Sequence, residues 1–236
     1  AKQVLHHPPE LTGLLQTALA SEIRLYRCIE ENITRMHREI AGHLAATPAS
    51  MLTTIRGIGI TLAAGVAAEI GPAEAQPSLR RLSSYAGIIP RVKQTGGPEK
   101  GPVIGTVSKR CNRILKDYAV QCGNHLGQHG PIDLHEDHRR RGANGQHADF
   151  GMARRFLRMA MRLMRTGESY VPPELREGAS MEELRVWYLD LWPKLLDKWI
   201  KVGAVHTAFH PDHPLGQWRE RIQEIYEIDL PLPKKN

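Results

Sequence analysis

Apolar residues return at seven-residue intervals in the segment from residue 11 to residue 46. They are Leu19, Tyr26, Ile33 and Ile40, with Ile29 and Met36 interleaved. A coiled-coil seam needs this alternation of three and four, because each helix must bring an apolar side chain to the same face every 3.5 residues. The spacing predicts one long amphipathic helix that pairs with a second copy of the chain. A helix packed on the core of its own domain would show the same spacing, so this alternative stays open.

The composition favours helices and excludes several classes of protein. Aromatic residues make up 6% of the 236 residues, so strands would find few of the side chains that suit a pleated surface, and we expect a mainly α fold. The three cysteines form no C-x-x-C pair, which excludes a disulfide framework and a zinc ribbon. No stretch approaches the roughly 20 apolar residues of a membrane span, and the N-terminal residues lack the apolar region of a signal peptide. We expect a soluble, cytoplasmic protein with no membrane partner.

The charge is distributed unevenly along the chain. The formal net charge is +7, but residues 78–116 hold nine basic residues and one acid, and residues 139–165 hold eight arginines and one acid. The rest of the chain is therefore acidic. This polarity is typical of a protein that presents a polyanion-binding face on an acidic body. The alternative is that the basic helices are solvated or paired with acids elsewhere in the chain.

Residues 50–71 carry a short glycine motif between two helical stretches. The sequence predicts a helix, a tight turn at Gly57-Ile58-Gly59, and a second helix that ends at Gly71. This is the pattern of a helix-hairpin-helix. Glycines leave the backbone N–H groups open, and those groups together with the positive end of a helix dipole can hold a phosphate oxygen without reading bases. An ordinary turn between two helices is the alternative, because the motif is short.

The remaining sequence predicts further helices around one irregular segment. The expected helices are a short basic one over 77–85, one capped by Ser108, a basic one over 150–164, and two amphipathic ones over 181–202 and 215–228. Glycines and prolines in residues 86–107 exclude a regular element across that segment. We therefore divide the chain into an N-terminal tail and long helix (1–47), a central domain (48–172), and an acidic, aromatic helical extension (173–236).

Four sequence blocks follow one another over residues 51–172. They are TIRGIG...A..AEIG, LSSYAGIIP...QTGG, G.VSKRCNRILK, and RRRGANGQ leading to an arginine-rich helix and GESYVP. Their order and spacing resemble the C-terminal half of the insertion-sequence transposases related to the Piv DNA invertase. The resemblance implies a DNA recombinase in which a RuvC-like domain with four acidic metal ligands precedes a coiled coil and this transposase domain, with a structured RNA as guide. It places Mg²⁺ in the acidic domain, which this chain lacks, and implies no cofactor in this chain.

The resemblance also points to Thr95 as the candidate catalytic residue. In the family, the nucleophilic serine lies in a Ser-Gly pair shortly after the AGL-x-P motif, and Thr95 stands at that position here. Threonine keeps the hydroxyl, but its extra methyl group crowds in-line attack on a phosphodiester. We therefore expect DNA binding, in DNA transposition or site-specific inversion, without strand exchange by this chain alone. Ser83 and Ser84 are expected to be helix-surface serines.

The predicted nucleic-acid-binding residues combine the hairpin glycines with the cations of the basic segments. They are Gly57, Gly59, Arg91, Lys93, Lys109, Arg110, Asn112, Arg113, Lys116, Arg154 and Arg155. The predicted partners are DNA, a structured guide RNA by resemblance, and a second copy of the chain through residues 11–46. By the same resemblance the protein belongs in the bacterial cytoplasm, on the nucleoid.

Two further hypotheses and two weak metal-ligand groups complete the interpretation. The chain could be a non-catalytic nucleic-acid-binding module that uses Thr95 only structurally, or a dimerisation scaffold whose basic faces pair with the acidic tail.

Ligand-type side chains gather at Asp133, His135, Glu136, Asp137 and His138, and again at His206, His210 and His213. Both groups lie beside proline or glycine, where the backbone does not fix converging ligands, and we predict no metal site.

Overall fold

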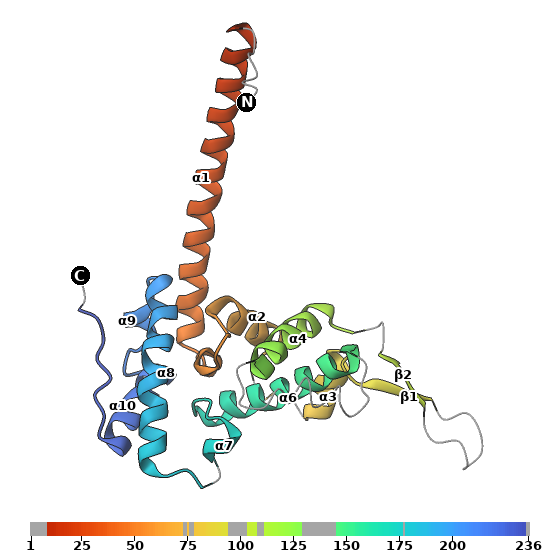
Figure 1. Cartoon of the computed structure of the whole chain (residues 1–236), viewed down its shortest axis with the longest axis vertical. Helices are drawn as coiled ribbons and strands as arrows, with labels where there is room; N and C mark the ends of the chain where they lie inside the picture. The colour runs from red at the N-terminus through yellow and green to blue at the C-terminus, as the bar shows by residue number, and fades with distance from the viewer. Residues whose placement is uncertain are drawn as a thin grey trace, which may run out of the picture. The chain divides into compact units, whose positions relative to one another are not determined.

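The structure is a computed structural model and describes residues 9–72, 75, 78–93, 103–107, 111–128, 145–176 and 178–234. Its contacts divide the chain into two units, residues 1–39 and residues 40–236. The fold is mainly helical, which confirms the predicted class (Figure 1). None of the described helices is both long enough and apolar enough to cross a membrane.

The elements follow one another as a series of helices with one short hairpin of strands. In chain order they are α1 (Pro9–Ala45), the 3₁₀ helix η1 (Pro48–Thr54), α2 (Ile60–Ile70), α3 (Leu79–Tyr85), β1 (Pro90–Lys93), β2 (Val103–Val107), α4 (Arg113–Gln128), α6 (Gly145–Thr166), α7 (Pro173–Arg176), α8 (Met181–Lys201), α9 (Val205–Ala208) and α10 (Pro214–Tyr226).

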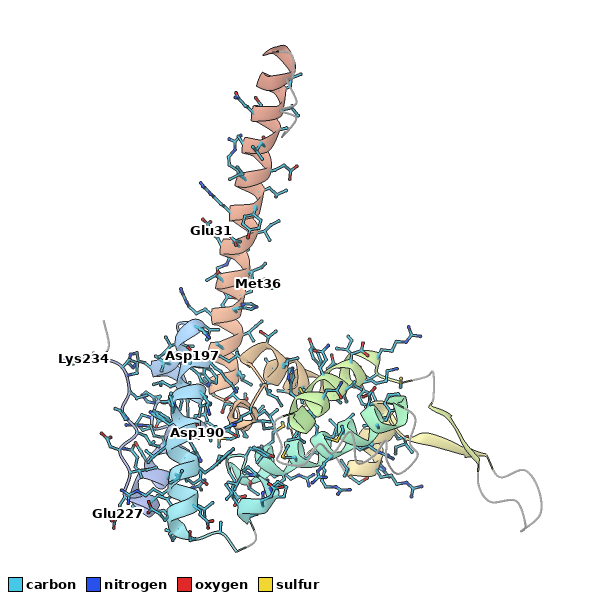
Figure 2. All side chains as sticks on the ribbon, viewed as in Figure 1. Glu31, Met36, Asp190, Asp197, Glu227 and Lys234 are labelled. Atoms are coloured by element: carbon cyan, nitrogen blue, oxygen red, sulfur yellow. The ribbon has the colours of Figure 1, made fainter. Side chains whose placement is uncertain are left out.

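The long N-terminal helix forms as the spacing predicts. Along α1 most seam side chains are exposed; the exposed fraction is 61% for Leu19 and 46% for Ile33. Glu31 and Met36 lie along this helix in Figure 2. Ile40 behaves differently, because it packs against the hydrophobic core of the second unit. The last seam residue therefore packs on the core of its own unit. Pairing with a second copy over the rest of α1 stays a prediction.

The first arm of the predicted helix-turn-helix is a 3₁₀ helix, not an α-helix. In η1, the hydroxyls of Ser50, Thr53 and Thr54 donate to carbonyls three residues earlier, at 2.8, 2.6 and 2.6 Å. Such side-chain bonds compete with the α-helical pattern, and they fit the tighter 3₁₀ turn. The second arm, α2, forms as predicted and ends at Gly71, whose φ of 69° is easy only for glycine.

Part of the segment predicted to be irregular is a two-stranded antiparallel ribbon. β1 pairs with β2 so that Val92 lies opposite Ile104, with an irregularity in register just after Pro90. The density of glycine and proline excludes a helix here. It does not exclude a short ribbon, because β-branched residues suit strands and proline is tolerated at a strand's first residue.

Glycines bring the central helices close together. A Cβ atom on Gly65 of α2 would lie 2.5 Å from the ring of Tyr118 in α4, so glycine is what allows these two helices to approach closely here. A Cβ on Gly123 of α4 would lie 2.8 Å from the backbone nitrogen of Ala153 in α6. α4 and α6 accordingly lie side by side, and α3 also packs against α6 (Figure 1).

The C-terminal extension packs through its aromatic residues. Trp192, Trp199 and Trp218 are buried, and the indole of Trp192 donates to the carbonyl of Pro231 at 3.2 Å. α8 and α10 both contact η1, so the extension lies in the same compact unit as the central domain. The division at residues 172 and 173 stays a prediction about the sequence.

Candidate nucleic-acid interface

The hairpin turn between η1 and α2 requires glycine at its first position. Gly57 has a φ of 79°, and a Cβ there would lie 2.9 Å from Nδ1 of His125. Ile58 is completely buried, whereas Gly59 caps α2 without a side-chain hydrogen bond. The first N–H groups of α2 therefore have no side-chain cap, which is the condition under which a helix start can hold an anion.

A half-buried lysine of α8, Lys198, binds the backbone of this turn. The ammonium group of Lys198 donates to the carbonyl oxygens of Thr53, Ile55 and Ile58 at 2.6, 2.9 and 2.8 Å. All three of its hydrogens are thus used on the backbone of the hairpin. Burial lowers the pKa of Lys198 to about 8, because the ammonium group gives up most of its hydration.

Other contacts of the C-terminal region add to this support. Arg56, the residue before Gly57, pairs with Asp190 of α8, and its guanidinium lies 5.3 Å from the centre of the Trp187 ring (Asp190 is labelled in Figure 2). The N–H of Tyr170 donates to the hydroxyl of Thr54 at 2.9 Å. Lys198 is not among the residues predicted from the sequence. One sequence feature could have indicated its role, since this lysine directly precedes Trp199 on an amphipathic helix.

Asn112 joins three helices and caps one of them. Its amide nitrogen donates to Glu69 Oε2 at 2.6 Å and to Tyr85 Oη at 2.9 Å, and its side-chain oxygen accepts from the N–H of Leu115 at 2.9 Å. α4 therefore begins at Arg113 with Asn112 as its cap, and the prediction of a cap at Ser108 is wrong. Because the Asn112 amide is occupied inside the protein, we leave it out of the proposed phosphate contacts.

Several cations on the helices around α6 have no carboxylate partner within the part of the chain that the structure describes. They are Arg80 and Arg81 of α3, Arg113 and Lys116 of α4, and Arg154, Arg155 and Arg158 of α6. All are exposed or half-buried. On α8, by contrast, Arg185, Lys194 and Lys201 each pair with an acid, and Lys198 donates to backbone carbonyls. Among the described residues, the predicted alternative of pairing within the chain therefore holds for Arg162 of α6, which pairs with Glu168, but not for the seven cations named above.

The remaining candidate residues fall in three groups. Arg91 and Lys93 lie on the backbone of β1. Thr95, Lys109, Arg110 and the group Asp133, His135, Glu136, Asp137 and His138 lie outside the described residues. Ser84 is exposed on α3, but Ser83 is only 2% exposed, so the expectation that both are surface serines is wrong for Ser83, which follows Leu82 on the inner side of the helix.

The three C-terminal histidines do not converge. Nδ1 of His213 lies 2.6 Å from the carbonyl oxygen of Thr207, and Nδ1 of His210 lies 3.4 Å from a carboxylate oxygen of Asp212. Across the described ranges, no three His, Cys, Asp or Glu side chains are placed to hold a metal ion.

These features define a helical, cation-rich domain, and its sequence is similar to transposases of insertion sequences. A transposase for insertion sequence element IS1328 from Yersinia enterocolitica is 36% identical over 116 residues, 49% of this chain and 33% of that protein. A probable family 20 transposase from Pseudomonas aeruginosa is 30% identical over 113 residues, 48% of this chain and 32% of that protein. No solved structure matches.

The central part of the chain also resembles a transposase family. Residues 49–131 match the Transposase IS116/IS110/IS902 family. An insertion element IS110 uncharacterized 43.6 kDa protein from Streptomyces coelicolor is also similar, 26% identical over 175 residues, 72% of this chain and 42% of that protein. The chain spans between about a third and about two fifths of the length of these relatives.

Proposed function

We propose that this chain is the nucleic-acid-binding C-terminal region of a transposase that acts in DNA transposition or site-specific inversion. The observation that carries the proposal is the set of cations on α3, α4 and α6 that have no carboxylate partner among the described residues, in a chain whose residues 49–131 match a transposase family. Unpaired guanidinium and ammonium groups favour phosphate oxygens, and binding them releases the counterions that surround DNA.

The hairpin supplies a second kind of contact. The uncapped amides at the start of α2 would meet a phosphate through the backbone, while Arg113 and Lys116 would meet others through their side chains. None of these contacts reads bases. Sequence choice would then come from elsewhere, and the resemblance supplies a structured guide RNA for that role.

Strand exchange would need parts beyond these contacts. The resemblance assigns metal chemistry to an acidic RuvC-like domain that precedes the coiled coil. No three ligand-type side chains converge in the described part of this chain. We propose that the role of this chain in the reaction is to bind and position the nucleic acid.

The binding role is tested by removing two unpaired charges. Replacing Arg113 and Lys116 with glutamine should lower the slope of log K against log salt by about two, which weakens duplex DNA binding roughly 60-fold at 0.1 M salt. The measurement is fluorescence anisotropy with a labelled duplex, and Lys201→Gln, which removes a cation already paired with Asp197, should leave the slope unchanged. A folded double variant with the wild-type slope would refute the role of α4.

The catalytic expectation for Thr95 has a separate test. The chain alone should form no covalent protein-DNA adduct on a denaturing gel, because the threonine methyl crowds in-line attack and the acidic domain is not supplied. Thr95→Ser, with that domain added in trans, should raise the amount of adduct. If the unmodified chain joins DNA strands and Thr95→Ala keeps that activity, both the inactivity and the assignment of the nucleophile are wrong.

The non-catalytic alternative predicts the same DNA binding but no adduct from Thr95→Ser under any condition. A pure dimerisation scaffold predicts no salt-dependent binding at all.

A further inference from the structure

Three arginines on α6 and α7 lie within electrostatic range of one another, and one of them lies over the ring of Tyr170. Arg155 and Arg162 lie on α6, seven residues and therefore two turns apart, which places their Cα atoms roughly 10 Å apart along the helix. Arg176 ends α7, and its guanidinium lies 5.9 Å from the centre of the Tyr170 ring. Arg155, Arg162 and Arg176 are called the arginine cluster below.

The base of this cluster is fixed. Tyr170 is 7% exposed, and its backbone N–H is held by Thr54 of η1. The carbonyl of Gly167, three residues earlier, accepts from Arg221 of α10 at 3.2 Å. Segment 167–170 is thus tied to both η1 and α10, so the ring under Arg176 is held in place before any ligand arrives.

The acids near the cluster leave two of its three arginines unpaired. Glu168 pairs with Arg162 at 3.0 Å, and Glu174 is exposed on α7. Arg155 and Arg176 have no carboxylate within ion-pair distance among the described residues. Burial lowers the pKa of Arg176, the positive charges of Arg162 and Arg155 lower it further, and Tyr170 and Glu168 oppose this shift.

We propose that Arg155, Arg162 and Arg176 form a second phosphodiester-binding site, on the middle and C-terminal part of α6 and the end of α7. The planar guanidinium can bind two oxygens of one phosphate, and Tyr170 holds Arg176 by its ring face. Arg158 and Arg165 continue the same stripe, which runs about 15 Å from Arg155 to Arg165 and matches the run of consecutive phosphates along one strand. This inference rests on the proposed nucleic-acid-binding function.

The test removes the two cluster arginines that have no acid partner. The full chain is titrated with a labelled 30-base-pair DNA duplex and, in a second arm, with a labelled RNA hairpin, between 50 and 300 mM salt. Arg155→Gln and Arg176→Gln should each lower the salt slope by about 0.9 and weaken duplex binding about eightfold at 0.1 M salt. Arg176→Lys should restore the slope, and Lys201→Gln is the control that changes nothing. Arg155 is exposed and unpaired, so its variant stays informative if an Arg176 variant unfolds.

The outcomes separate this inference from the function on which it rests. A reduced slope in the DNA arm or in the RNA arm supports the site and tells which nucleic acid it contacts. If the wild type binds with a salt slope that Arg113→Gln/Lys116→Gln lowers but the cluster variants leave intact, the function stands and the second site is refuted. If the wild type binds neither probe, both are refuted.

Discussion

Lys198→Met is expected to lower the free energy of unfolding by about 3 kcal/mol, because three buried carbonyl oxygens lose their hydrogen-bond donor at once. Each carbonyl left without a partner costs about 1 kcal/mol or more, and the methionine side chain cannot replace any of the bonds. The loss should also loosen the turn at Gly57, so DNA binding should weaken in the fraction of protein that stays folded. Urea denaturation followed by circular dichroism measures the first effect.

A matched variant shows whether the position matters more than the charge. Lys201 lies one turn further along α8, is exposed, and pairs only with Asp197 at 2.6 Å, so Lys201→Met should change stability by less than about 0.5 kcal/mol. Equal effects of the two substitutions would show that Lys198 does not hold the hairpin.

The pH dependence of the Lys198 contribution has a definite sign. The folded pKa of about 8 lies below the ordinary value of 10.5, so between these values the unfolded chain keeps a proton that the folded chain has released. The stability of the wild type relative to Lys198→Met should therefore rise with pH from 8 to 10.5 and be constant below 8. A stability difference that stays constant from pH 8 to 10.5 and falls only above 10.5 would place the folded pKa above the ordinary value.

The second large effect concerns the oligomeric state. Residues of the α1 seam are exposed within their unit, and Ile33 occupies the core position that, with β-branched side chains, favours two parallel strands. We expect a dimer with twice the 26.5 kDa mass of the chain. Tyr26→Lys with Ile33→Lys should convert it entirely to monomer in light scattering, because two charges would be buried in the seam.

The structure decides which seam residues can be used. Ile40 packs on the core of residues 40–236, so a lysine there would damage the fold and give no clean test of pairing. Cys28→Lys with Thr34→Lys adds the same two charges at exposed positions outside the seam and should leave the dimer intact. A wild-type chain that scatters as a monomer would contradict the prediction.

Local sequence chemistry was sufficient for most elements. Seven-residue spacing determines α1, Gly71 ends α2, and Ser180 with Glu183 forms the capping box that starts α8. The structure differs from the prediction in two segments, where one local conformational preference competes with another. Hydroxyl bonds turned the first hairpin arm into a 3₁₀ helix, and β-branched residues made a ribbon inside a segment rich in glycine.

The sequence shows that the candidate interface is rich in cations. It does not show which of these cations form ion pairs with acids. Counting charges identifies Arg113 and Arg155 as cations, whereas only the folded chain shows that neither has an acid among the described residues and that Arg56 does. Ion pairs form between residues far apart in sequence, and Arg56 and Asp190 are separated by 134 positions.

The sequence by itself determined the helical class, the long seam of α1 and the positions of the hairpin glycines, because each depends on residues within a few turns of one another. Tertiary structure alone decided that Lys198 holds the hairpin, that Asn112 joins α2, α3 and α4, and that Arg176 lies over Tyr170. Those contacts join side chains to distant backbone or rings. No spacing rule specifies such partners, since they meet only when separate helices pack on one core.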